Sequence, residues 1–226
     1  MVTQHLSEAD HMLVSAAVRA AEAASSGEVV TIVAGRSDAY HDVGLHYAVL
    51  AMLLVPLAWA LLPQGAVDWF AALLLGWNAE WSRPLAMLYL FAALALTFLV
   101  FRYLLAWTPL RMALTPGRTK ARRVHRRAVE LFRTGCELKT RGRTGVLIYL
   151  SLAEHRAEIV ADEAIASQVE REVWVEALAA LIAEAKAGRP GAGLAKAVEI
   201  VGAVLAPILP PLALDDNELP DRVVEL

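Results

Sequence analysis

Two long apolar stretches constrain the fold of this chain more than any other feature of its sequence. Residues 43–62 carry no formal charge, and residues 85–105 carry only Arg102, close to their end. About 20 apolar residues in a helix cross the roughly 30 Å hydrocarbon core of a bilayer. The sequence therefore predicts two transmembrane helices.

The segment between the two predicted spans is apolar but short. Residues 66–76 contain a single charge, Asp68, and fall short of the roughly 20 residues that a crossing requires. Tryptophans gather around this segment, as they do at membrane interfaces: Trp59, Trp69, Trp77 and Trp81. We expect residues 66–76 to lie in the outer interface, so that the chain leaves and re-enters the membrane from the same side.

Lysines and arginines are distributed unevenly around the two spans. Arg83 is the only one between them, whereas a dense group follows the second span: Arg111, Arg118, Lys120, Arg122, Arg123, Arg126 and Arg127. Positively charged loops stay in the cytoplasm. We therefore expect a multi-pass protein of the inner (plasma) membrane, with both termini and the soluble part in the cytoplasm. The single cysteine, Cys136, and an N-terminus without the pattern of a cleaved secretion signal agree with that compartment.

The segments on either side of the spans carry patterns of helices and strands. Residues 6–24 are amphipathic at helical spacing, and Ser7 with Asp10 forms a capping box at their start. Uninterrupted apolar runs predict strands that are buried on both faces. Residues 28–34 and 146–152 are such runs. Residues 153–156 predict the turn of a β-hairpin, and residues 157–161 its returning strand. The later predicted helices are residues 119–133, a helix opened by a capping box at 167–170, and residues 194–205.

Five segments match a known pattern: 6–10 (LSEAD), 27–33 (GEVVTIV), 143–151 (RTGVLIYLS), 156–165 (RAEIVADEAI) and 217–221 (NELPD). In these segments and in the order of its elements, the chain resembles the TPM domain family, in the bacterial branch where a membrane hairpin splits the domain. The resemblance covers nearly everything outside residues 41–113.

The resemblance implies an α/β fold, a three-layer sandwich with a short mixed sheet, split by an inserted two-helix transmembrane hairpin. We expect residues 1–40 and 114–213 to form the two parts of the α/β domain, residues 41–113 the hairpin, and residues 214–226 an acidic C-terminal tail. Members of the family are linked to phosphatase activity, to binding of divalent metals and to the upkeep of membrane protein complexes.

The chain departs from the family at two turns. Most members carry an Asp-Asn-Gly turn before the Val-Leu strand, where this chain has Gly-Arg-Thr-Gly at 142–145. The acidic residue of that turn is therefore absent. A glycine-rich turn that is common after the hairpin is replaced by Ala161, Asp162 and Glu163.

One candidate metal site precedes and enters the first span. Asp38, His41 and Asp42 are spaced so that they would share one face of a helix. Oxygen and imidazole ligands in such an arrangement can hold a divalent cation such as calcium or magnesium. The alternative is a polar helix entry at the level of the headgroups.

A second candidate site lies around the predicted β-hairpin of residues 146–161. It consists of Asp162 and Glu163, with Glu154, His155 and Glu158 nearby. Paired carboxylates beside a histidine could bind a metal or act as acid and base. The alternative is a solvated turn.

Common catalytic motifs are absent from the sequence: there is no Cys-x-x-Cys pair, Gly-x-Ser-x-Gly elbow, phosphate-binding loop or His-Glu-x-x-His. Cys136 with His125 is a conceivable nucleophile and base, although a lone cysteine is usually a small buried group.

A basic patch follows the second span. Residues 111–143 hold 11 of the 21 lysines and arginines, against Glu130 and Glu137 alone. Its expected centre is Arg118, Lys120, Arg122, Arg123, Arg126 and Arg127. We expect it to contact the anionic headgroups of the lipid bilayer, where each cation contributes about 1 kcal/mol. The alternative is that the charge only sets topology, and nucleic acid is not an expected partner because no aromatic residue interleaves the arginines.

The function that these features favour is that of a membrane-anchored binding or maintenance module acting on other membrane protein complexes. A metal-dependent phosphatase, implied by the family resemblance, is the alternative. Convergence of the carboxylates of Asp38, Asp42, Asp162 and Glu163 in one pocket would favour the phosphatase.

Overall fold

The computed structural model describes residues 6–76, 82–137, 144–211 and 222–226. It divides the chain into two compact units. Unit 1 combines residues 1–38 with residues 116–226, and unit 2 consists of residues 39–115.

A small mixed sheet lies at the centre of unit 1. Its strands are β1 (Glu28–Ala34), β2 (Gly145–Ser151), β3 (Arg156–Ala161) and β4 (Val224–Glu225), in the order β3-β2-β1-β4. β1 pairs in parallel with β2 and with β4, and β2 pairs antiparallel to β3 across a short turn. β4 falls within the predicted tail and was not expected from the sequence.

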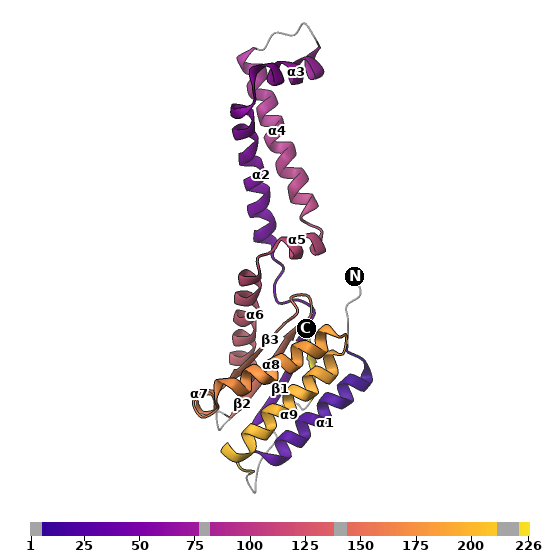
Figure 1. The fold of residues 1–226 in the computed structure, drawn as a ribbon, viewed down its shortest axis with the longest axis vertical. Coiled ribbons are helices and arrows are strands. Elements are labelled where there is room, and N and C mark those ends of the chain that lie inside the picture. Colours follow the sequence, from indigo (N-terminus) through magenta and orange to yellow (C-terminus); the bar gives the residue numbers. More distant parts are fainter. Residues whose placement is uncertain (1–5, 77–81, 138–143, 212–221) are drawn as a thin grey trace. The chain divides into compact units, whose positions relative to one another are not determined.

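Both faces of the sheet are covered, which explains why every residue of β1 and β2 is buried and why most of them are apolar. Val29 and Val33 of β1 join one core with helices α1 (Glu8–Ala24), α8 (Arg171–Lys186) and α9 (Pro190–Ile208). Val30 and Ile32 of the same strand face the other core, beneath helix α6 (Gly117–Phe132). Figure 1 shows α6 apart from the group formed by α1, α8 and α9.

The predicted α/β sandwich is wrong. The protein is helix-rich, and its sheet is small, with four strands in the described residues. The reason lies in α9, which packs mainly against α1 and α8 and touches the sheet only slightly. Small residues bring these helices together: a Cβ added at Gly202 would lie 2.6 Å from the Cβ of Ala21, and one at Gly193 would lie 2.8 Å from the carbonyl oxygen of Leu181. Helix-on-helix packing thus dominates unit 1.

The two predicted capping boxes have different outcomes. The first is confirmed, because the Ser7 hydroxyl accepts from the amide of Asp10 at 3.1 Å and the Asp10 carboxylate accepts from the amide of Ser7 at 3.1 Å. The second is wrong, because a short helix α7 (Glu163–Ala166) places Ser167 in helical geometry rather than the extended geometry of an N-cap. α8 begins later, at Arg171, with no side-chain cap.

All the elements of unit 2 in its described residues are helices. It contains α2 (His41–Leu61), α3 (Gln64–Leu75), α4 (Arg83–Leu104) and α5 (Thr108–Leu114). α2 and α4 pack side by side along their lengths (Figure 1).

The end of α4 is held by a buried arginine. Arg111 of α5 is only 4% exposed, and its guanidinium donates to the carbonyl oxygen of Leu105 at 3.0 Å. That carbonyl belongs to the C-terminal group of α4 that has no partner within the helix. Gly44 of α2 lies against this contact, since an added Cβ would lie 3.6 Å from the Cδ of Arg111. Arg111 therefore joins α2, α4 and α5.

Three helices of the described chain are long and apolar enough to cross a membrane: α2, α4 and α9. The first two overlap the predicted spans. α9 is a third, and it differs because half of its most apolar window is buried inside the protein, against 17% for α2 and none for α4.

Candidate functional site

A group of polar side chains lies where the parallel strands β1 and β2 end. Ser37 follows β1, and its hydroxyl lies 2.9 Å from the phenol oxygen of Tyr149 and 2.9 Å from the hydroxyl of Ser151. Glu154 completes this polar network by accepting from the amide of Ser37 at 3.1 Å and from the hydroxyl of Ser151. Ser151 and Glu154 are buried. The network closes the carboxyl edge of the sheet, the edge at which sites of α/β folds usually form.

Burial raises the pKa of the Tyr149 phenol. The hydrogen bond with Ser37 opposes this rise, and the nearby carboxylate of Glu154 adds to it. Tyr149 therefore stays protonated and can act as a hydrogen-bond donor inside the network.

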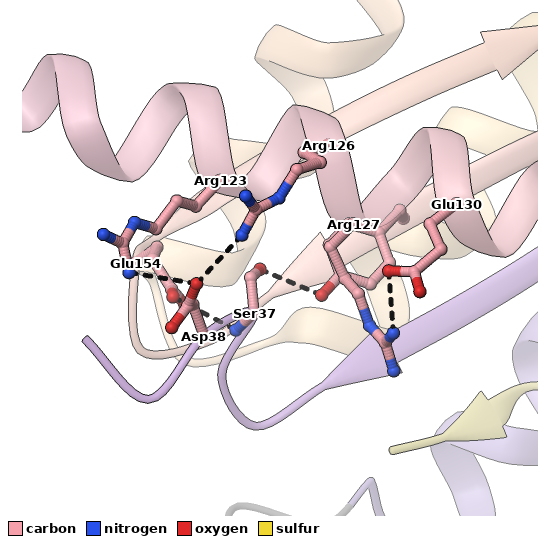
Figure 2. Close-up of polar contacts among 8 residues, drawn as sticks. Ser37, Asp38, Arg123, Arg126, Arg127, Glu130 and Glu154 are labelled. Atoms are coloured by element: carbon pink, nitrogen blue, oxygen red, sulfur yellow. Dashed lines mark hydrogen bonds and ion pairs between the residues drawn. The ribbon is translucent and has the colours of Figure 1, made fainter. Parts of the chain in front are cut away.

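Asp38, a predicted metal ligand, forms ion pairs instead. Its Oδ2 lies 3.0 Å from Nη1 of Arg123 and 3.2 Å from Nη2 of Arg126, both on α6 (Figure 2). The Asp38 side chain is 22% exposed, so two guanidinium groups neutralise a carboxylate with limited access to solvent.

The spacing proposed for the first metal site does not hold. α2 begins at His41, so Asp38 precedes the helix and does not share a helical face with His41 and Asp42. Asp38 also belongs to unit 1, whereas the other two belong to unit 2. In the part of the chain that the structure describes, no group of three or more His, Cys, Asp or Glu side chains could hold a metal ion.

The second predicted site is divided by β3. Glu154 and His155 lie in the turn before this strand, and Asp162 and Glu163 lie after it. A six-residue strand spans about 20 Å, so the two ends cannot share one ion. Glu158, within the strand, lies 3.3 Å from Nδ1 of His125.

Asp162 has a structural role at its end of the sheet. It is 6% exposed, and its Oδ2 accepts from the amide of Gly145 at 2.9 Å while its own amide donates to the carbonyl oxygen of Gly145 at 3.1 Å. These bonds join the start of β2 to the end of β3. Glu163 is exposed at the start of α7.

Three further features predicted from the sequence fall at least partly outside the described residues. The side chain of Cys136 is not among the described ones, so its pairing with His125 stays a prediction. Residues 142–143 of the altered turn and residues 217–221 of the predicted tail also lie outside the described residues.

The basic patch lies on α6 and splits into two sets. Arg123 and Arg126 bind Asp38, and Arg127 binds Glu130 at 3.0 Å. Within the described residues, no acidic side chain pairs with Arg118, Lys120 or Arg122.

Sequence reasoning missed the polar network around Ser37. A usable signal existed, because Ser37 and Ser151 each stand at the end of a predicted strand, and adjacent parallel strands place their ends together. The ion pairs of Asp38 gave no such signal, since Arg126 follows it by 88 residues.

Comparisons with known proteins bear on the fold alone. No protein-family model and no curated protein matches the chain. It is similar to the NMR structure of the BA42 protein from the psychrophilic bacterium Bizionia argentinensis, with 17% sequence identity and a TM-score of 0.55. That match covers 100% of this chain and 98% of the other.

Proposed function

We propose that this chain is a membrane-anchored binding module. In this proposal α2 and α4 cross the inner (plasma) membrane as a hairpin, and unit 1 lies in the cytoplasm, where it binds or helps to maintain other membrane protein complexes. Membership of the TPM domain family remains part of the proposal.

The proposal rests on the apolar surface of α2 and α4. No residue of α4 is buried, and Phe91 and Leu96 are 69% and 64% exposed. On α2, Leu53 and Leu61 are 58% and 75% exposed. Soluble proteins rarely expose a continuous apolar patch of more than a few hundred Å². A lipid environment removes this surface from water.

The distribution of charge supports the proposed orientation. Arg83, the first residue of α4, is the only lysine or arginine from the end of α2 through the first turn of α4, whereas six lie on α6. Cationic segments near a span remain in the cytoplasm. α9 is not proposed as a span, because its buried face packs in the core of unit 1.

No observation in the described chain favours the phosphatase. Two of its five expected ligands are engaged elsewhere, Asp38 by two arginines and Asp162 by a backbone amide. The phosphatase therefore stays a prediction from family resemblance.

Site-directed labelling tests the proposed topology. Cys136→Ser removes the only cysteine of the chain. Single cysteines then replace Arg19, Ser82 or Lys186, all of which are exposed. In spheroplasts, a membrane-impermeant maleimide should label position 82 at once, and positions 19 and 186 only after the membrane is opened. Labelling of 19 and 186 from opposite sides would overturn the hairpin.

Co-purification from native membranes tests the binding role. A membrane protein complex that the module maintains should be retained by the intact chain in mild detergent. A variant whose unit 1 is unfolded by Val198→Asp keeps the hairpin and should lose that complex. Equal retention by both chains would show that unit 1 is not the binding part.

A further inference from the structure

α6 is amphipathic in an unusual way, because its polar face is almost entirely cationic. Val124, Ala128 and Phe132 are at most 5% exposed and pack on the sheet. The rest of the helix carries six cations and one carboxylate, Glu130. A solvated helix face usually mixes both signs, so this imbalance requires an explanation.

The two sets of cations follow one another along the helix. Arg118, Lys120 and Arg122 come first, and in the described chain no acidic side chain pairs with them. Arg118 and Arg122 are exposed, and Lys120 is half-buried. Arg123 and Arg126 follow, both bound to Asp38.

Short stretches of chain connect both Asp38 and α6 to the proposed spans. Asp38 precedes His41, the first residue of α2, by three residues, a tether of about 10 Å when fully extended. α6 itself begins at Gly117, shortly after α4 ends at Leu104, and α5 takes up much of the connection.

We propose that Arg118, Lys120 and Arg122 bind the anionic phospholipid headgroups of the leaflet where α2 begins and α4 ends, and that Asp38 withholds Arg123 and Arg126 from the same surface. This inference rests on the proposed function, since it requires the hairpin to lie in a membrane. The planar guanidinium fork matches the oxygens of a phosphate. Three cations near an anionic leaflet favour the surface by about two orders of magnitude.

The role of Asp38 follows from its geometry. Its carboxylate lies 3.0 Å and 3.2 Å from two guanidinium nitrogens whose N–H groups a headgroup phosphate would otherwise bind. Figure 2 shows both arginines directed at this one carboxylate. Removing its charge should end both ion pairs, and Arg126, whose side chain is 73% exposed, should then be available to the membrane.

Nucleic acid fits this face less well than lipid does. Single-stranded nucleic acid is held by aromatic side chains that stack on its bases as well as by cations. The only aromatic residue of α6 besides His125 is Phe132, which is buried against the sheet.

A quenching experiment on the full-length chain tests the proposal. The chain carries Cys136→Ser and a fluorophore on Gly117→Cys, at the exposed first residue of α6. It is reconstituted in nanodiscs of phosphatidylcholine, alone or mixed with phosphatidylglycerol, containing a lipid with a nitroxide on its headgroup. Phosphatidylglycerol should increase the quenching severalfold, and raised salt should reverse the increase because it screens exposed charges.

Matched variants separate the basic face from total charge. The triple variant Arg118→Gln, Lys120→Gln, Arg122→Gln should abolish the effect of phosphatidylglycerol. Arg19→Gln, Arg171→Gln, Lys186→Gln removes three exposed cations from α1 and α8 and should preserve it. Equal quenching in both lipid mixtures, or equal loss in both triple variants, would overturn lipid binding by α6.

Asp38→Asn tests the withholding role. It should increase the effect of phosphatidylglycerol, whereas Glu172→Gln, which changes the net charge equally on α8, should not. If unit 1 of Asp38→Asn resists proteolysis as the wild type does and the effect of phosphatidylglycerol does not increase, the role of Asp38 is overturned. An equal increase with Glu172→Gln would assign the effect to net charge and not to Asp38. If Asp38→Asn loses that resistance, Asp38→Glu should keep the wild-type response, and a change with Asp38→Glu would overturn the role. Failure of the hairpin itself would appear separately, in the labelling of position 82.

Discussion

α4 and α9 have nearly the same chemical description and opposite surroundings. Each is long and apolar enough to span a membrane. None of the residues of α4 is buried, whereas nine residues of α9 are buried, among them Leu194, Val198 and Leu205. Length and apolar content therefore do not distinguish a proposed membrane helix from a core helix.

Residue size and the placement of charge do distinguish the two helices. α9 contains Gly193 and Gly202 at close helix contacts, and it keeps Lys196 and Glu199 exposed on one side. α4 contains no glycine, and between its terminal residues its only charge is Arg102 in the last turn. α9 thus packs against protein and keeps one charged side in solvent, whereas α4 presents large apolar side chains such as Phe91 and Leu96 to its surroundings. Unit 1 as a whole likewise encloses a large buried core, whereas most of the exposed large apolar side chains belong to unit 2.

The largest expected effect comes from placing a charge in each helix. Val198→Asp puts a carboxylate where the side chain is fully buried in unit 1. It should lower the free energy of unfolding of unit 1 by more than about 4 kcal/mol, because a buried unpaired charge loses its hydration. Urea-dependent proteolysis of unit 1 in nanodiscs measures this loss.

The matched change in α4 should act on insertion instead. Leu96→Asp should leave the stability of unit 1 unchanged and disfavour insertion of α4 by about 3 kcal/mol, measured as the fraction of chain recovered in membranes. A Leu96→Asp chain that inserts normally would contradict the lipid exposure of α4.

The next largest effect concerns residue size. Gly202→Leu places a branched side chain where even a Cβ would lie 2.6 Å from Ala21. It should destabilise unit 1 by about 3 kcal/mol, because a packed core resists added volume. Ala92→Leu, on the exposed surface of α4, is the control and should leave the stability of unit 1 unchanged in the same proteolysis assay. Equal effects would remove the distinction between the two helices.

Polar groups inside unit 1 give a smaller, pH-dependent contrast. The raised pKa of Tyr149 means that folded unit 1 holds the phenol proton more tightly than the unfolded chain does. The stability that this tighter binding contributes is fully present below the pKa of the phenol in the unfolded chain, about 10. It is lost as the pH rises from there through the raised pKa of the folded chain, by at most about 1.4 kcal/mol per pH unit.

Tyr149→Phe tests that assignment. Urea unfolding at pH 8 and above pH 10 should show a smaller alkaline loss of stability in this variant than in the wild type. Tyr103→Phe, at an exposed position of α4, should behave as the wild type. An unchanged alkaline loss with Tyr149→Phe would place its cause elsewhere in the chain.

The smallest expected effect is a gain in stability. Thr31 on β1 is 1% exposed, and its hydroxyl has no hydrogen-bond partner within the described structure. Thr31→Val keeps the shape and should stabilise unit 1 by about 1 kcal/mol, because it removes a buried, unsatisfied polar group. Thr97→Val on α4 should leave unit 1 unaffected. Destabilisation by Thr31→Val would reveal a hidden partner of the hydroxyl.

Local patterns in the sequence were sufficient for part of this fold. The box formed by Ser7 and Asp10 could be predicted because both partners lie in one helical turn, and β1 because it is apolar on both faces. The box at Ser167 failed because the preceding helix α7, which the sequence analysis did not anticipate, changed its backbone geometry. β4 has two residues and is defined by its pairing with β1, so no local sequence pattern predicts it.

The candidate sites depended on contacts between distant parts of the chain. Asp38 was chosen as a metal ligand from its neighbours His41 and Asp42, whereas its actual partners are on α6. Asp162 and Glu154 are close in sequence but are separated by the length of β3. Spacing along the chain identified the chemistry of these residues and not their partners.

Photolabelling in native membranes tests the contrast between α4 and α9 most directly. A lipid-soluble reagent that generates a carbene labels side chains exposed to hydrocarbon, and mass spectrometry locates the adducts. Adducts are expected on α2 and α4, and none on α9 in folded protein. Adducts on α9, or an unlabelled α4, would contradict this contrast.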